Sequence, residues 1–498
     1  MMNIPFADVP GWFAARKHAA ELAIIHDGDA ISWSALELRT TQRAHLLAEM
    51  GVKPGDFVAI CLPNGLEFFE VTFAVWKLGG TICPLPFGTS VEEAKALLSL
   101  LKPSLLIGGD SSWGDWVHLP ADRDVSKNPT TQILSPISRY WAALPSGGST
   151  GRPKIIVQHM MAITGLKYRV PAGLASGYRV LNPGAPLHHA APCLITHWAL
   201  FLGGQVYSMP VFDPEETLRQ IQKHKIDWVY LVPTMMHRIW KLPPKIRESY
   251  DLSTLKFVVH TASPMPPWLK EAWISWLGPE RIIEHYGGSE NIGGTVINGD
   301  EWLGHRGSVG RPPSGSVRII DCWGRALPAN HVGEICFEAG DGPELTFHYV
   351  GAEHRQPADG WATFGDFGYL DDDGYLYLVD RRDDMIVRAG VNVFPAEVEA
   401  ALTLHPDVLS CAVIGLPDAD LGQRIHAIIE LCEGVKLEQF VDSMREFLKR
   451  HLSKEKHPAT YEAVTGAIWN GAGKVRRSAL REERIRWREA GIKFEFVQ

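Results

Sequence analysis

The sequence is poor in cysteine, and its cysteines form no paired motif. Of 498 residues only 7 are cysteines, and no Cys-x-x-Cys pair occurs among them. Scattered cysteines argue against a disulfide framework and against a structural zinc site, because both need cysteines at close, regular spacings. The expected environment is therefore a reducing one.

The sequence also lacks a long apolar run and an excess of positive charge. No stretch is apolar over the length needed to cross a bilayer, and no basic-then-apolar leader is recognisable. The 57 acidic residues outnumber the 49 lysines and arginines, which gives a net charge of −8. This balance argues against general binding to nucleic acid. We therefore expect a cytoplasmic protein with no transmembrane segment and no nucleic-acid partner.

The length and the order of the predicted elements indicate an α/β protein with more than one domain. A chain of 498 residues exceeds the size of one hydrophobic core. Apolar spacing predicts a helix over 31–50, with Ser34 as its N-cap, and a further helix capped by Asp213. Predicted strands and helices alternate, with strands at 57–62 and 81–85 and a helix at 67–78 between them. This alternation is typical of a largely parallel sheet.

A loop rich in glycine and hydroxyl groups is the most informative stretch of the chain. Residues 146–151 read SGGSTG and are followed by Arg152, Pro153 and Lys154. Glycine lets backbone N–H groups approach an anion closely, and hydroxyls add further donors. The loop is therefore suited to a polyphosphate, and the candidate ligands are Ser146, Gly147, Gly148, Ser149, Thr150, Gly151 and Lys154.

Two other classes of glycine-rich loop are excluded by the residues on the carboxyl side of the loop. A Walker loop needs Gly-Lys-Ser/Thr and then a helix, and neither follows in this loop. Gly147 to Gly151 fits the Gly-x-Ser-x-Gly pattern of a hydrolase nucleophile elbow, which requires a helix directly after the serine. Pro153 and the β-branched run 155–157 predict a strand there instead.

The loop resembles the phosphate loop of the acyl-adenylate-forming superfamily, which includes acyl-CoA synthetases, carrier-protein adenylation domains and beetle luciferases. Further motifs similar to those of the family come in the family's order over nearly the whole chain: YGGSE at 286–290, GRP at 310–312, TFGD at 363–366, DRRD at 380–383 and GAGK at 471–474. The resemblance implies a large amino-terminal, multi-sheet α/β domain, 1–382, that binds ATP and the acyl group. It also implies a small, mobile α+β carboxy-terminal domain, 383–498.

The resemblance implies an ATP site built from several motifs. A predicted strand at 257–263 leads into the adenine turn of the family, so Ala262 and Ser263 are candidates for adenine contact. Tyr286 offers a flat face to the base beside Gly287, and Glu290 offers a hard oxygen ligand to Mg²⁺, with Thr150 as a second metal candidate. The carboxylate of Asp366 suits the two ribose hydroxyls, and Arg381 can reach ribose or phosphate.

The acyl site is expected around Val232, His189 and Gly288. A predicted strand ends at Val232, and ligands of α/β proteins bind at the carboxyl ends of strands. His189 matches the family histidine that gates the acyl pocket, and the pair His188–His189 has no acidic or cysteine partner at the spacing of a metal site. Gly288 stands where the family often has a larger residue. Apolar side chains of the segment 186–202 (Leu194, Ile195 and Trp198) are expected to face a large acid, although a core role explains them nearly as well.

The small domain is expected to carry the moving parts of the reaction. Lys474, which comes after a glycine, is suited to stabilising charge in a carboxylate–phosphate transition state, and together with Glu290 and His189 it forms the predicted catalytic set. Asp383 matches the family hinge, and Gly390 matches the glycine that lines the CoA tunnel. Two departures from the family pattern are Phe364 in place of threonine and Ile468 in place of a proline before the lysine loop.

The resemblance therefore predicts an AMP-forming acyl-CoA ligase that uses ATP, Mg²⁺ and CoA. Segments 146–154, 262–267, 301–312 and 380–399 look most like those of ligases for bile acids and bulky terpenoid acids, so we expect a small-molecule acid that is bulky, hydrophobic and polycyclic. The alternatives left open are a carrier-protein adenylating enzyme, a luciferase-type oxygenase and a non-catalytic nucleotide-binding protein. The sequence leaves the oligomeric state open, and a homodimer is one possibility.

Overall fold

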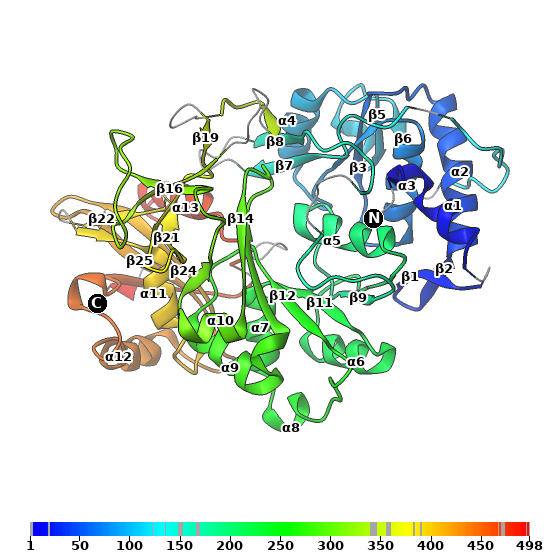
Figure 1. Cartoon of the computed structure of the whole chain (residues 1–498). Helices are drawn as coiled ribbons and strands as arrows, with labels where there is room; N and C mark the ends of the chain where they lie inside the picture. The colour runs from blue at the N-terminus through cyan, green and yellow to red at the C-terminus, as the bar shows by residue number, and fades with distance from the viewer. Residues whose placement is uncertain are drawn as a thin grey trace.

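A computed structural model describes residues 3–17, 20–121, 123–134, 136–147, 153–165, 170–338, 346–354, 360–381, 384–388, 391–466, 468–469, 474–494 and 496–497. Figure 1 shows a large domain, blue to yellow-green, and a smaller body, yellow to red, beside it. This is the mixed α/β architecture with a large amino-terminal and a small carboxy-terminal domain that the sequence predicts.

The first parallel sheet confirms the predicted alternation. Its strand order is β4-β3-β5-β6, with β3 (Phe57–Cys61), β4 (Thr81–Pro84), β5 (Leu105–Gly108) and β6 (His118–Leu119) all parallel. Helix α3 (Leu66–Lys77) joins β3 to β4. Helix α2 (Trp33–Glu49) already includes Ser34, so the prediction of Ser34 as its cap is wrong. Ser32 caps it instead, because its hydroxyl accepts the Ala35 N–H at 3.2 Å.

The second sheet positions most of the candidate site. Its strand order is β14-β13-β12-β11-β9-β10-β1-β2, parallel from β13 to β1 and antiparallel at both edges. The strands are β1 (Leu22–His26), β2 (Asp29–Ser32), β9 (Arg179–Asn182), β10 (Gln205–Ser208), β11 (Trp228–Leu231), β12 (Phe257–His260), β13 (Ile282–Gly287) and β14 (Gly294–Asn298). Asp213 caps helix α6 (Pro214–His224) as predicted, accepting the Glu216 N–H at 2.7 Å.

Two antiparallel sheets complete the large domain. One has the order β18-β8-β7, with β7 (Ala143–Gly147), β8 (Pro153–Gln158) and β18 (Phe347–Val350). The other has the order β15-β21-β20-β17-β16, with β15 (Ser308–Gly310), β16 (Val317–Ile320), β17 (Gly333–Glu338), β20 (Asp366–Leu370) and β21 (Leu376–Arg381). The acidic segment 371–375 is the turn between β20 and β21.

The small domain has its own sheet and its own core. Its strands are β22 (Ile386–Arg388), β23 (Val391–Val393), β24 (Val408–Asp418), β25 (Gly422–Leu431), β26 (Thr460–Val464) and β27 (Phe496–Val497), and its helices are α11 (Pro395–Leu402), α12 (Leu437–Leu448) and α13 (Arg477–Glu489). Pro395 occupies the first turn of α11, as predicted. The chain passes from β21 of the large domain to β22 of the small one, and the expected boundary at 382–383 lies outside the described residues. Within those residues, each helix is too short or too polar to cross a membrane.

Contacts from helix α7 (Pro233–Trp240) and the residue after it join the two domains. His237 Nδ1 donates to the Leu409 carbonyl at 3.0 Å, and Lys241 Nζ donates to the Pro406 carbonyl at 3.0 Å. Arg238 on the same helix forms an ion pair with Glu430 of β25 at 3.6 Å. The small domain is therefore seated on the large one in this structure (Figure 1).

Candidate functional site

The predicted phosphate loop connects the two strands of a hairpin. β7 and β8 are antiparallel, with Ser146 opposite Lys154 and Gly147 opposite Pro153. A strand rather than a helix therefore comes after the loop, which confirms that the Gly-x-Ser-x-Gly match is not a nucleophile elbow. Gly148, Ser149, Thr150 and Gly151 lie outside the described residues.

Lys154 and Glu290, which are far apart in sequence, meet beside Tyr349. Lys154 Nζ lies 3.9 Å from Glu290 Oε1 and 3.9 Å from the centroid of the Tyr349 ring. The Tyr349 hydroxyl donates to the same Glu290 oxygen at 2.7 Å, and the Thr346 hydroxyl donates to the Glu290 carbonyl at 2.7 Å. The Gln158 amide donates to the Ser289 carbonyl and so ties β8 to this loop. The hairpin β7–β8 and the YGGSE segment thus bring the Lys154 ammonium and the Glu290 carboxylate together. We call this place, where the hairpin meets the segment, the corner.

This corner fits a Mg²⁺ that arrives with a polyphosphate. The described residues contain no cluster of three histidine, cysteine or carboxylate ligands. Mg²⁺ is commonly held by one or two carboxylates together with substrate phosphates and water, so a single carboxylate such as Glu290 is a sufficient protein ligand. Nearby, His354 Nε2 is buried without a hydrogen-bond partner in the described part of the chain. The pKa of His354 is lowered by burial, with Glu290 opposing and Lys154 adding to that shift.

Tyr286 and Asp366 are joined directly. The Tyr286 hydroxyl donates to Asp366 Oδ2 at 2.7 Å, although the two residues belong to different sheets. Gly287 ends β13 and pairs with Gly294 of β14, while Asp366 opens β20 opposite Arg381 in register. The structure therefore brings together the predicted adenine and ribose motifs.

The predicted adenine turn begins earlier than expected and has a strained backbone. The strand predicted over 257–263 ends at His260, because Ala262 has φ = +84°, which is incompatible with an extended strand. Ser263 Oγ is buried without a hydrogen-bond partner among the described residues. β12 runs parallel to β13, so Ala262 and Ser263 emerge at the same sheet edge as Tyr286. A strained residue next to an unsatisfied hydroxyl is typical of a ligand-binding turn.

Ala262→Gly should stabilise the protein. Glycine adopts positive φ without the steric cost that alanine has there, which outweighs its greater freedom in the unfolded chain. We expect a gain of about 0.5–1 kcal/mol in the free energy of unfolding, measured by urea denaturation. Ala272→Gly, inside helix α9 (Pro267–Leu277), is the matched control and should destabilise by about 0.5–1 kcal/mol. A loss in both variants would contradict the strain at Ala262.

Gly288 allows a close approach of Phe364. A Cβ placed on Gly288 would lie 2.4 Å from Phe364 Cε1 and 2.9 Å from Glu290 Oε2. Phe364 in turn packs edge-on against Tyr286, with ring centroids 6.2 Å apart. The large Phe364 ring, one of the departures from the family pattern, therefore occupies the space that a side chain at position 288 would need.

His188 and His189 stand together at the start of helix α5 (Ala190–Phe201), with ring centroids 4.2 Å apart. Burial, with Arg476 adding to it, lowers the pKa of His188 to about 4. The pKa of His189 is also held well below its usual value, first by burial and then by the neighbouring His188, Lys474 and Arg476. The charges of Lys474 and Arg476 in the small domain thus act on a histidine of the large domain.

The remaining acyl candidates are buried or partly buried. Val232 is 1% exposed and precedes α7, while Trp198 is 1% and Ile195 is 7% exposed within the main core. The expectation that Trp198 and Ile195 face a ligand is wrong, because both pack inside the large domain. Leu194 is partly buried and packs against the same core.

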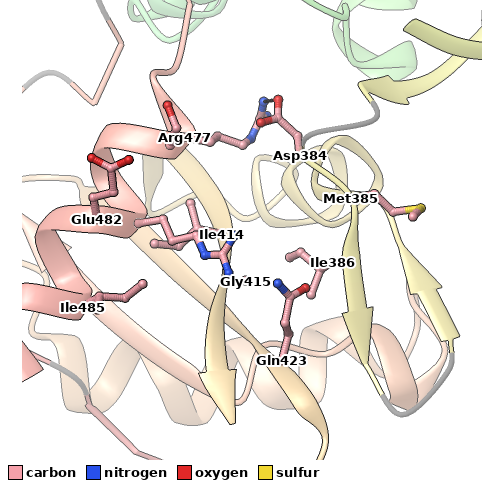
Figure 2. A pocket seen from close by; sticks show the side chains of 11 residues that line it. Asp384, Met385, Ile386, Ile414, Gly415, Gln423, Arg477, Glu482 and Ile485 are labelled. Carbon is pink, nitrogen blue, oxygen red and sulfur yellow. Dashed lines mark hydrogen bonds and ion pairs between the residues drawn. The ribbon is translucent and has the colours of Figure 1, made fainter. Parts of the chain in front are cut away.

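Two predicted residues of the small domain, Asp383 and Gly390, lie outside the described residues. The described part of the small domain contains a cavity of about 270 Å³, and Figure 2 shows Arg477 and Asp384 at its upper edge with Ile386 and Ile414 below. Arg477 Nη1 donates to Asp384 Oδ2 at 3.0 Å across this edge.

Sequence reasoning missed Tyr349, although this residue joins Lys154 to Glu290. The segment around it carries no recognisable local signal, and only the antiparallel pairing of β18 with β8, which sets Tyr349 opposite Ile156, brings it to the corner. It also missed Glu93, whose ion pair with Arg476 spans 3.2 Å between the domains.

Comparison with known proteins agrees with this arrangement. A model described as AMP-binding enzyme matches residues 12–346, and one described as AMP-binding enzyme C-terminal domain matches residues 397–474. A feruloyl-CoA synthase of Amycolatopsis sp is 30% identical, covering 94% of this chain and 96% of its own. A 3-[(3aS,4S,7aS)-7a-methyl-1,5-dioxo-octahydro-1H-inden-4-yl]propanoyl:CoA ligase of Rhodococcus jostii is 27% identical, covering 94% and 97%. The solved o-succinylbenzoate CoA synthetase of Bacillus subtilis with its acyl-adenylate has a TM-score of 0.80 at 24% identity, covering 97% of this chain and 99% of that one.

Proposed function

Because the chain belongs to the AMP-binding enzyme family and is an AMP-forming acyl-CoA ligase that works through an acyl-adenylate, we propose that its acid is bulky, hydrophobic and polycyclic. The observation that carries this proposal is the similarity to the Rhodococcus jostii ligase, whose named substrate is a fused-ring propanoate. The feruloyl-CoA synthase, similar over the same length, argues for an acid with at least one ring.

The nucleotide is proposed to lie along the corner formed by β7, β8 and the YGGSE segment. Ser146, Lys154 and the loop between them would hold the β- and γ-phosphates. Tyr286 would stack on adenine beside Ala262 and Ser263, and the unsatisfied Ser263 hydroxyl would gain a partner. Asp366, oriented by the Tyr286 hydroxyl, would accept from the ribose, with Arg381 on the neighbouring strand.

The enzyme uses ATP, Mg²⁺ and CoA. Glu290 would hold the Mg²⁺, which when bound neutralises phosphate charge. Tyr349 would orient Glu290 by its hydrogen bond and keep Lys154 over its ring. The Glu290 carboxylate and the Lys154 ammonium would then both face the phosphates.

The chemistry requires positioning and charge stabilisation and no enzyme nucleophile. The substrate carboxylate attacks the α-phosphorus of ATP, pyrophosphate leaves, and the acyl-adenylate forms. Lys474 is proposed to stabilise the negative charge on the reacting oxygens. His189, kept neutral by burial and nearby cations, would border the acyl group. Being neutral, it would not compete with Lys474 for the negative charge on the reacting oxygens.

The CoA thiol then attacks the acyl carbonyl and expels AMP. For this step we propose that the small domain turns about Asp383, withdraws Lys474 and presents Gly390 to the pantetheine arm. Gly288 and Val232 are proposed to border the acyl site, with Phe364 closing the space beside Gly288.

A panel of acids tests the proposal through pyrophosphate release. We expect fused-ring carboxylates to give kcat/KM about tenfold or more above those of acetate and a medium straight-chain acid, because larger apolar acids bury more surface. Highest kcat/KM for a short linear acid would contradict the substrate class and leave the ligase activity intact. Replacing CoA with a phosphopantetheinyl carrier protein in the same assay separates a carrier-loading enzyme from a CoA ligase.

A further inference from the structure

Two adjacent arginines on the carboxyl side of Lys474 contact different domains. Arg476 Nη2 lies 3.2 Å from Oε1 of Glu93, which stands in the first turn of helix α4 (Val91–Leu101) in the large domain. Arg477 contacts the small domain, through Asp384 Oδ2 at 3.0 Å and Glu399 Oε2 at 2.7 Å (Figure 2 shows Arg477 beside Asp384). The segment that carries Lys474 is thus held from both sides.

The contact on the small-domain side is independent of how the domains are arranged. Glu399 lies on α11, is 8% exposed, and also accepts the Val413 N–H at 2.8 Å. Its bond to Arg477 is charge-assisted and partly buried, which makes it a strong anchor. Because Asp384, Glu399 and Val413 belong to the small domain, this anchor moves with that domain.

The Arg476–Glu93 contact, in contrast, exists only when the two domains meet as they do here. Arg476 and Glu93 both influence the pKa of His188, and Lys474 and Arg476 both lower the pKa of His189. Only Val475 stands between Lys474 and Arg476 in the chain. The ion pair therefore fixes the Lys474 segment against the start of α4 in the large domain.

We propose that Glu93 and Arg476 are positioning residues that place Lys474 for formation of the acyl-adenylate. This inference rests on the proposed role of Lys474. Their side chains are 31% and 52% exposed, so the pair contributes little to the stability of the fold. The pair instead stabilises the domain arrangement in which Glu93 and Arg476 meet. It should therefore affect the half-reaction that uses this arrangement, the formation of the acyl-adenylate.

Charge variants of the pair test the proposal in the full chain. Glu93→Gln and Arg476→Gln should each slow acyl-adenylate formation, measured as pyrophosphate release, by about three- to fivefold. Glu93→Arg, which sets two cations against each other, should slow it by about tenfold, and the swap Glu93→Arg with Arg476→Glu should restore the rate to within about twofold. Thioester formation from supplied acyl-adenylate should stay unchanged in all four proteins.

A second ion pair between the domains is the matched control. Arg238 and Glu430 are 3.6 Å apart and also partly exposed, but Arg238 lies on α7 and not beside Lys474. Arg238→Gln should change adenylate formation by less than about twofold. An equal loss in Arg238→Gln would mean that any docking contact has this effect, and it would overturn the specific role of Glu93 and Arg476.

The remaining outcomes also decide the proposal. Unchanged rates in the Glu93 and Arg476 variants, or no rescue in the swapped pair, would overturn it while the wild-type ligase activity stands. A wild-type chain that forms no acyl-adenylate with any acid would instead overturn the proposed substrate class together with the role of Lys474.

Discussion

Lys474→Ala is expected to slow acyl-adenylate formation by about 10²- to 10³-fold, the usual effect of removing one group that stabilises charge in a transition state. The segment that carries Lys474 is held against the large domain by the Arg476–Glu93 ion pair, and no other charge of the small domain takes the place of the lysine in the proposed mechanism. Formation of the thioester from supplied acyl-adenylate should be largely spared, because the lysine is withdrawn for that step.

The two half-reactions should be measured separately in the same preparation. Lys449→Ala removes an exposed lysine from the end of α12 in the same domain and should leave both rates unchanged. Equal losses in the two half-reactions of Lys474→Ala would contradict the assignment, since a residue that acts only in the first step cannot limit the second.

Glu290→Gln should lower the rate of adenylate formation by about 100-fold and shift its Mg²⁺ dependence to higher concentrations. The amide keeps the shape of the side chain but removes the charge that would hold the metal ion and that lies 3.9 Å from Lys154. Titration of Mg²⁺ at saturating ATP measures the effect directly.

Two further variants show whether the metal dependence comes from this corner. Tyr349→Phe removes only the hydroxyl that donates to Glu290 and should cost about tenfold, with a smaller shift in the same direction. Glu338→Gln, an exposed carboxylate at the end of β17, should have no effect. An unaltered Mg²⁺ dependence in Glu290→Gln would contradict the proposal that Glu290 is a ligand of the metal ion.

Local features of the fold were predictable wherever they depend on neighbours in sequence. The proline and the β-branched run 155–157 predicted the strand β8, and Asp213 predicted the start of α6, because both effects act within a turn or two of the chain. The sequence predicts Ser34 as the cap of α2, whereas Ser32 caps the helix. Either hydroxyl stands near the start of the same apolar pattern, and only the backbone angles distinguish the two serines.

The strand at 257–263 shows where a local pattern fails. Its residues are all compatible with a strand, but the chain turns at Ala262 into a conformation that alanine does not favour. Surrounding structure imposes that turn. Likewise, Trp198 has the size and the apolar character of a pocket residue, and only the packing of α5 decides that it belongs to the core.

The sequence by itself determined the family, the order of the nucleotide motifs and the division into a large and a small domain, because motif spacing is a property of the chain. Tertiary structure alone decided which side chains meet. Tyr349 reaches Glu290 across 59 residues, and Arg476 reaches Glu93 across 383, so neither pair leaves a trace in local spacing. Such contacts depend on the register of β18 on β8 and on how the small domain sits on the large one, and both are set by the packing of the whole molecule.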